Sequence, residues 1–337
     1  MAITAGCLLL LVLYLINISI GSVLIPPLEI LGGLFGREFS KASWETIVFE
    51  YRVPKALTAM LAGVALSLSG LQMQTFFRNP LAGPYVLGIS SGAGLGVAVL
   101  ILSGSAFGWN LLSGDVWGIW STIIAASLGA MLVLVLMSLM AWRVRDSMTL
   151  LIIGLMFGSA TGAVISVLSY FGGAEELKIF TVWSMGSLGA TGSQQLPVFF
   201  FACLLGMVPL LFFIKSYNAM LLGEGYAESM GVNLYRLRWA MILSTGILAG
   251  SATAFCGPLA FIGIAVPHLA RMVFRTADHR VLFPASALIG AGFLLVCDSV
   301  SQWPGSAETL PINAVTSLFG APLVIWLILN RNFSRDF

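Results

Sequence analysis

Residues 78–94 read RNPLAGPYVLGISSGAG and lie between two apolar runs. Pro80 and Pro84 have no backbone N–H to donate, and Gly83 and Gly88 weaken a regular helix. At membrane depth, irregular backbone of this kind survives only where protein buries it or where it lines water. The stretch therefore predicts a transport pathway rather than a passive membrane anchor.

The composition of the chain requires a membrane around this stretch. Its 337 residues are 58% hydrophobic and 9% charged, with a mean hydropathy of +0.98, whereas soluble domains have about 25% charged residues. We predict an all-α polytopic membrane protein, a single domain over residues 1–337 with about ten transmembrane helices, because each span needs roughly 20 apolar residues. The predicted spans are 5–24, 53–74, 86–104, 118–141, 147–170, 195–214, 236–256, 258–271, 282–302 and 312–330.

The basic residues predict the orientation of these spans. Both termini lie on one side, and basic residues favour the cytoplasmic side. With cytoplasmic termini, five basic residues lie outside, namely Arg37, Lys41, Arg52, Lys55 and Lys178. Eleven lie inside, namely Arg78, Arg143, Arg145, Lys215, Arg236, Arg238, Arg271, Arg275, Arg280, Arg331 and Arg335. We therefore predict a multi-pass protein of the cytoplasmic (inner) membrane. The basic residues are dispersed over several loops, which argues against a nucleic-acid partner.

Three longer polar segments separate the spans. External loops are predicted at 25–52 and 171–194, and a cytoplasmic segment at 215–235. Within the cytoplasmic segment, LGEGYAESMGV at 222–232 is punctuated by glycine and too polar to rest in lipid. It suits the docking of a cytoplasmic partner, and a solvated loop is the alternative.

A weak repeat relates two of the predicted spans. Leu-Ala-Gly at 61–63 is followed by Gly70, and Leu-Ala-Gly at 248–250 is followed by Gly257 with the same spacing. Each block has basic residues upstream and a Gly-Pro shortly downstream. The predicted topology makes the two blocks run in opposite directions, which indicates an inverted repeat of the kind found in transporters. Chance similarity between two helices rich in Gly and Ala is the alternative.

Gly154, Gly158 and Gly162 share one face of the fifth predicted span. Such a face lets another backbone approach closely. It indicates either ordinary helix packing or a helix at a pathway or dimer interface.

Two polar residues in or near apolar spans need a role. Asp298 is the only carboxylate placed inside a span, where a charge is costly and marks function by default. Its position near the outer end also lets it reach water, so proton coupling is one of two interpretations. His268 has no second ligand at metal spacing, which favours a hydrogen-bonding role.

Enzymatic chemistry is not expected of this chain. Its sequence contains no P-loop, H-E-x-x-H or G-x-S-x-G motif. No metal site is predicted. The four cysteines lie in or beside apolar spans without a C-x-x-C pair, which predicts buried structural thiols at Cys7, Cys203, Cys256 and Cys297.

Taken in order, these motifs resemble the FecCD-type permeases, the membrane subunits of type II ABC importers for iron-siderophores, haem and cobalamin. The resemblance runs from about residue 50 to the C-terminus. The matching blocks are RVPK at 52–55, NPLAGP at 79–84, LGISSGA at 87–93, the loop at 223–232, GP at 257–258, PHLAR at 267–271, LPI at 310–312 and GAP at 320–322.

The resemblance implies partners and site residues. It implies a homodimer around a central pathway, two cytoplasmic ATPase subunits and a periplasmic or lipid-anchored substrate-binding protein. ATP would be used by the ATPase partner, and no cofactor is expected on this chain. Candidate ATPase contacts are Gly223, Glu224, Ala227 and Gly231, and candidate docking residues for the binding protein are Arg52 and Lys55. Candidate pathway or gate residues are Asn79, Pro80, Gly83, Pro84, Ser91, Gly154, Gly158, Gly162 and Asn313.

The chain departs from the family pattern in two places. The family has an Arg where Gln302 stands, which removes one docking charge. The family's Glu-Leu-Pro-x-Gly motif is replaced in this chain by TLPIN at 309–313. Asn313 therefore stands in place of the glycine and adds polarity at the pathway entrance.

Two functional hypotheses follow from these observations. The first is a permease subunit that moves a chelate inward by alternating access, driven by ATP hydrolysed in its partner. The second is a self-sufficient secondary transporter, for which Asp298 is the available coupling group.

Overall fold

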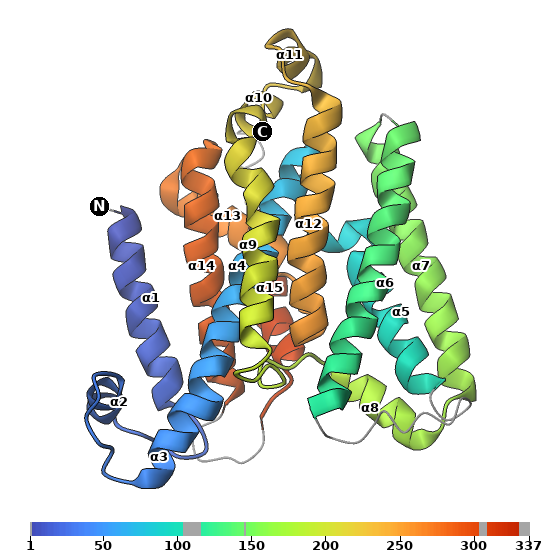
Figure 1. Ribbon diagram of the computed structural model, residues 1–337. Coiled ribbons are helices and arrows are strands. Elements are labelled where there is room, and N and C mark those ends of the chain that lie inside the picture. Colours follow the sequence, from blue (N-terminus) through green and yellow to red (C-terminus); the bar gives the residue numbers. More distant parts are fainter. Residues whose placement is uncertain (1, 104–115, 145, 303–308, 330–337) are drawn as a thin grey trace.

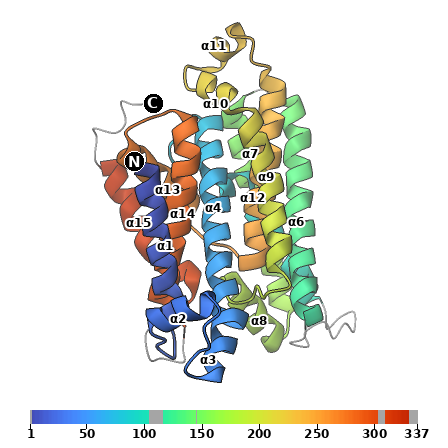
Figure 2. The same ribbon diagram turned by 60° about the vertical axis from the view of Figure 1, so that its left-hand side comes forward.

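The computed structural model describes residues 2–103, 116–144, 146–302 and 309–329, and all regular structure in these ranges is helical. The helices stand roughly side by side in one bundle (Figures 1 and 2). They are α1 Ala2–Ser19, α2 Pro27–Leu34, α3 Ala42–Thr46, the π-helix η1 Ile47–Arg52, α4 Val53–Phe76, the 3-10 helix η2 Pro84–Leu87, α5 Ile89–Leu102, α6 Val116–Arg143, α7 Ser147–Phe171, α8 Ala174–Ser184, α9 Leu196–Phe212, α10 Ile214–Met220, α11 Glu224–Ser229, α12 Leu234–Cys256, α13 Ile262–Phe274, α14 His279–Ser301 and α15 Ile312–Leu329.

The predicted spans coincide with apolar helices. Five helices of the described chain are long and apolar enough to cross a membrane alone, namely Ala42–Phe76, Gly118–Arg143, Met148–Phe171, Leu234–Cys256 and His279–Ser301. A sixth candidate is the pair α9 and α10, which is bent by 63°. Shorter apolar helices, α1, α5, α13 and α15, lie at the remaining predicted spans. The all-helical polytopic membrane fold is thereby confirmed.

The polar segments contain short helices at the two ends of the bundle (Figure 1). Loop 25–52 holds α2, α3 and the π-helix, and loop 171–194 holds α8. The segment 215–235 holds most of α10 and all of α11. We call the two ends the α3 end and the α11 end. Since α4 starts at the α3 end and α12 starts at the α11 end, the described members of the predicted outer and inner groups of basic residues lie at opposite ends, while Arg145, Arg331 and Arg335 lie outside the described residues. Which end faces the cytoplasm stays a prediction.

The central helix α4 packs against α14, α12 and α13. At two of these contacts glycines, which lack a side chain, let the backbones of the two helices touch. A Cβ on Gly63 would lie 2.2 Å from the Gly290 carbonyl oxygen of α14, and a Cβ on Gly70 would lie 1.8 Å from the Gly263 carbonyl oxygen. Small residues at such positions supply the close van der Waals contact that holds membrane helices together.

The packing of the two halves follows a reciprocal pattern. One set contains α4, α5, α6 and α7, and the other contains α12, α13, α14 and α15. The first helix of each set packs on the third helix of the other, since α4 contacts α14 and α12 contacts α6. The helices α4 and α12 run in opposite directions (Figure 1). This pattern favours the inverted repeat over chance similarity.

The cysteines differ from the prediction in one case. Cys203, Cys256 and Cys297 are buried, but Cys7 is exposed. Cys7 belongs to α1, which lies at one edge of the bundle against α14 (Figure 2), so one face of α1 points away from the protein.

Candidate transport and docking site

The Pro/Gly stretch at 78–94 breaks the helix, as predicted. Helix α4 ends at Phe76, the 3-10 turn η2 follows, and α5 begins at Ile89. Gly88 takes a left-handed conformation with φ +73°, and Arg78 has φ +46°. A second break precedes α13, where Gly257 has φ +72° and Phe261 has φ +66°. Each break therefore belongs to one half of the inverted repeat.

The two breaks contact each other through hydrogen bonds from side chains to backbone. The Tyr85 hydroxyl donates to the Leu259 carbonyl and accepts from the Leu259 N–H at 3.0 Å. His268 lies with Nε2 at 2.8 Å from the Pro80 carbonyl oxygen, so this nitrogen donates. These bonds satisfy backbone groups that Pro and Gly leave without helix partners. They also give His268 the hydrogen-bonding role that its isolation in the sequence favoured.

The predicted gate residues of the first break lie at this junction. Asn79 Oδ1 accepts from the Leu81 N–H at 2.9 Å and closes a tight turn. A Cβ on Gly83 would lie 3.0 Å from Ile264, and the ring of Pro84 lies against Gly263. This junction therefore joins the two halves of the repeat.

The glycine face of α7 divides into two parts. A Cβ on Gly88 would lie 3.1 Å from the Gly154 carbonyl oxygen, and a Cβ on Gly158 would lie 3.5 Å from Ser91 Oγ. Gly154 and Gly158 thus pack α7 against η2 and α5. By contrast, no described atom outside its own helix backbone lies within 4 Å of the position that a Cβ would take on Gly162.

Asn313 holds the second break in place. Its side-chain Oδ1 accepts from the Ala260 N–H at 3.0 Å, and its backbone N–H donates to the Met185 carbonyl at 3.1 Å. The residue therefore joins α15 to both the second break and the end of α8.

A cavity of about 750 Å³ lies at the α11 end, between the end of α4 and the predicted coupling segment. Its walls include Gly223, Glu224 and Arg271. Arg271 donates to Gln74 Oε1 at 2.6 Å, and Gln74 donates to the Ile264 carbonyl at 3.2 Å. The coupling segment and the end of α4 thus share one cavity with Arg271 of α13, and Gln74 connects this cavity to Ile264 at the start of α13.

The predicted coupling residues have different environments. Glu224 accepts two hydrogen bonds from Arg238 Nη2, at 2.8 and 2.9 Å, which joins α11 to α12. Ala227 is buried. Gly223 and Gly231 have φ +109° and +83°, so they form the turns on either side of α11.

Helix α10 makes contacts that the sequence did not predict. Asn218 Oδ1 accepts from the backbone N–H of His279 at 2.9 Å and lies 2.8 Å from His279 Nδ1. His279 Nε2 lies 2.8 Å from Thr75 Oγ1 of α4. The Tyr217 hydroxyl donates to Gln72 Oε1 of α4 at 2.7 Å. No sequence motif singles out any of these residues. Their role becomes visible only in the contacts that they make with one another in the folded chain.

The two predicted docking residues have different surroundings at the α3 end. The Arg52 guanidinium donates to the carbonyls of Ile18, Ser19 and Val23, and the residue is 8% exposed. It closes the C-terminal end of α1, whose last carbonyls lack helix partners. Lys55 instead lines a cavity of about 360 Å³. The Arg52 guanidinium is thus used in hydrogen bonds within the chain, whereas Lys55 is accessible from a cavity.

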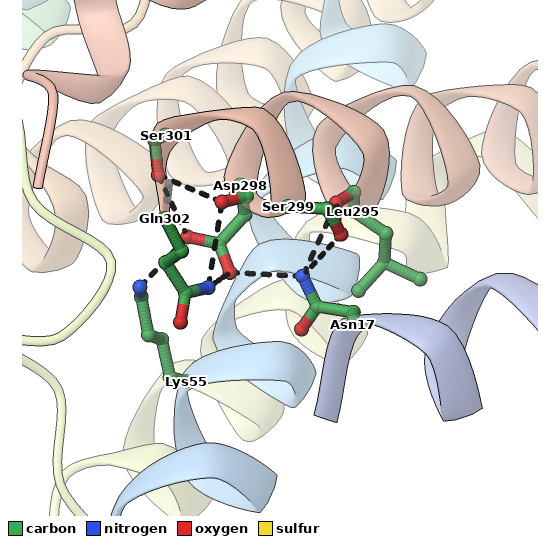
Figure 3. A network of polar contacts seen from close by, with 7 residues as sticks. All are labelled: Asn17, Lys55, Leu295, Asp298, Ser299, Ser301 and Gln302. Carbon is green, nitrogen blue, oxygen red and sulfur yellow. Dashed lines mark hydrogen bonds and ion pairs between the residues drawn. The ribbon is translucent and has the colours of Figure 1, made fainter. Parts of the chain in front are cut away.

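Lys55 forms an ion pair that the sequence did not predict. Its Nζ lies 3.0 Å from Asp298 Oδ1 of α14 (Figure 3). The other carboxylate oxygen accepts from Asn17 Nδ2 at 2.9 Å and from Gln302 Nε2 at 2.6 Å. The buried carboxylate of Asp298 is therefore paired and fully hydrogen-bonded.

This geometry agrees with the comparisons with known proteins. The model of the FecCD transport family matches residues 9–330. This chain belongs to that family. This chain is 35% identical over 326 residues to the vitamin B12 import permease BtuC of Klebsiella pneumoniae, and the alignment covers 96% of this chain and 91% of BtuC. It is 34% identical over 336 residues to the hemin transport permease HmuU of Yersinia pestis, covering 97% and 96%.

A solved structure shares the fold of this FecCD chain. It is a metal-chelate type ABC transporter in an inward-facing conformation, with a TM-score of 0.84, 29% identity and coverage of 97% of this chain and 98% of that one. The chain is accordingly a permease subunit of an ABC importer and not an enzyme, as its motifs predicted.

Proposed function

We propose that this permease moves an iron-siderophore, haem or cobalamin-type chelate inward, driven by ATP that two partner ATPase subunits hydrolyse. A separate binding protein delivers the chelate, and two copies of the chain enclose the pathway. The names of the relatives support this class of substrate, since they concern vitamin B12, hemin and a metal chelate. ATP binds only to the partner, and the chain itself carries no cofactor.

The observation that carries the proposal is the shared cavity at the α11 end. There the coupling segment, the end of α4 and Arg271 of α13, the helix that follows the second break, surround one space. Movement of α11 on an ATPase surface can therefore reach both breaks through Gln74 and Arg271. The breaks then open or close by alternating access.

The candidate residues take roles along this route. Glu224 and Gly231 lie on the surface that meets the ATPase, the buried Gly223 and Ala227 hold α11 against the chain beneath that surface, and the Pro/Gly junction together with Gly162 lines the path. The α11 end faces the cytoplasm, because it carries most of the described basic residues. Lys55 at the opposite end meets the binding protein, and Arg52 holds α1 against the start of α4.

The ion pair of Asp298 argues against a self-sufficient secondary transporter. A coupling carboxylate must lose and gain its ion during each cycle. Asp298 instead is paired with a cation of the chain itself, Lys55, and accepts hydrogen bonds from two amide donors.

Reconstitution into liposomes tests the proposal. Uptake of a ferric siderophore, haem and cobalamin is measured for the chain alone and for the chain with its ATPase and binding protein. We expect uptake of one of these chelates only with the complete system and ATP, and none with a non-hydrolysable ATP analogue. Uptake by the chain alone under an ion gradient would instead establish the secondary transporter.

A further inference from the structure

A small cavity at the α3 end contains a charged pair in its wall. The cavity has a volume of about 360 Å³ and lies between α8, α14 and the start of α15. Among its described lining residues, only Lys55 and Asp298 are charged. Figure 3 shows their side chains meeting between α4 and α14, with Asn17 of α1 on the far side of the carboxylate.

The two members of this pair differ in how many other polar partners they have. Asp298 is 1% exposed and keeps two amide donors on Oδ2, from Asn17 and Gln302, as well as Ser301 Oγ at 3.5 Å from Oδ1. The Lys55 side chain is 21% exposed, and within the described chain its ammonium has Asp298 as its one polar partner. The carboxylate would therefore remain hydrogen-bonded if Lys55 left, whereas Lys55 can turn toward a new anion in the cavity.

We propose that this cavity is a carboxylate-exchange site. An acidic side chain of the docked binding protein enters it and takes Lys55 from Asp298. The inference rests on the proposed function, in which the α3 end meets the binding protein. Asp298 thus competes with the partner for one ammonium group, and the internal pair forms again when the partner leaves.

The exchange has a cost that sets the strength of docking. Once Lys55 turns away, Asp298 is a buried anion with neutral donors only, which is less favourable than the pair. The binding protein must supply this free energy each time it docks. Removing the negative charge of Asp298 should therefore tighten docking, and removing one of its neutral donors should weaken docking.

The experiment measures the dissociation constant of the solute-binding protein of the same transport system on the permease in nanodiscs. We expect Asp298→Asn to tighten docking by about tenfold and Lys55→Met to weaken it by about tenfold, the range of a partly buried charge pair. In the Lys55→Met background, Asp298→Asn should change nothing. Acetic anhydride labelling of Lys55, followed by mass spectrometry, should be faster in Asp298→Asn than in the unmodified chain.

Two further variants keep the test decisive. Asn17→Leu removes a neutral donor from Asp298 at a buried position that a partner cannot reach, and we expect docking to weaken and Lys55 labelling to slow. Ser19→Ala is the matched control, because within the described chain its hydroxyl bonds to the Leu15 carbonyl of its own helix and to neither Asn17 nor the ion pair.

The outcomes separate the two proposals. If the unmodified chain docks the binding protein while Asp298→Asn and Asn17→Leu bind with unchanged affinity, the exchange is overturned and the proposed function stands. If the unmodified chain does not dock the binding protein at all, the proposed function fails and the exchange fails with it.

Discussion

At the level of single residues, Gly63 and Gly70 bring α4 into backbone contact with two other helices. The Gly70 position is the tighter, since a Cβ there would lie 1.8 Å from the Gly263 carbonyl oxygen. Backbone cannot yield as a flexible side chain can, so any larger residue must push α4 and α13 apart.

We expect Gly70→Ala to lower the free energy of unfolding by about 2 kcal/mol, because overpacking a tight contact costs that much. Thermal unfolding in detergent measures the change. The matched control is Gly162→Ala, where a Cβ meets open space. It should be neutral or stabilising by up to about 1 kcal/mol through helix propensity. Equal losses in both variants would contradict the packing argument.

Asp278 is a residue whose effect on stability depends on pH. It caps the N-terminus of α14, and hydrogen bonds from the Arg280 N–H and then the Asn218 amide lower its pKa below the ordinary 3.8. A carboxylate with a lowered pKa in the folded state stabilises the fold above its unfolded pKa. That contribution is lost as the pH falls through the folded pKa.

Asp278→Ala should therefore cost about 1 kcal/mol at both pH 8 and pH 5, the usual effect of losing an N-cap. The difference from the unmodified chain should shrink only below pH 3.8. Thermal unfolding at several pH values measures it. Asp278→Asn keeps a capping oxygen that does not titrate, so it should remain near the unmodified stability at pH 8. A cost that disappears already between pH 8 and pH 5 would contradict this account.

At the level of elements, α10 lies within the coupling segment and connects α11 to the core. It is bent by 63° from α9 and places Tyr217 and Asn218 against α4 and α14. Asn218 contacts both His279 and Asp278 at the start of α14. In the proposed mechanism, α10 therefore passes movement of α11 to two central helices at once.

We expect Asn218→Leu to reduce uptake per ATP hydrolysed on the order of tenfold, the usual size of one coupling term. ATPase binding and hydrolysis should persist, because the α11 surface is unchanged. Uptake and phosphate release measured together in proteoliposomes give the ratio. Ser229→Ala is the control, since its hydroxyl bonds only within its own turn of α11. A normal ratio in Asn218→Leu would exclude α10 as the connection.

At the level of the whole molecule, one side of the bundle is poorly covered. Only 17% of the apolar window of α7 is buried within the chain, compared with 78% for the helix Ala42–Phe76. Lipid or a second copy must cover the rest, and the proposed homodimer does so with the open glycine face at Gly162 near the pathway.

Native mass spectrometry of the detergent-extracted protein checks this arrangement. We expect a species of twice the 35.9 kDa chain mass, without any partner protein added. Addition of the ATPase should then increase the mass by two ATPase subunits. A single-chain mass that persists at all protein concentrations would contradict the homodimer.

Much of the fold could be predicted because its signals are local. A long apolar run forms a helix in lipid wherever it occurs, and Pro84 or Gly88 interrupts it through its own backbone. The polar segment that holds α11 also followed from local composition. The site was predicted less completely. Glu224 was assigned to the coupling segment, but its pairing with Arg238 and the insertion of α10 depend on how helices rotate against each other.

The sequence by itself determined the apolar helices, the break at 78–94, the repeated Gly-Pro blocks and the family. Each of these features depends on the types of residue and on their spacing along the sequence. Only the tertiary structure decided that Arg52 turns inward while Lys55 meets Asp298, and that Tyr85 joins the two breaks. The physical reason is that each contact joins residues far apart in the chain. Their distance is set by helix rotation and by close approach at glycines such as Gly63 and Gly70, which no local pattern records.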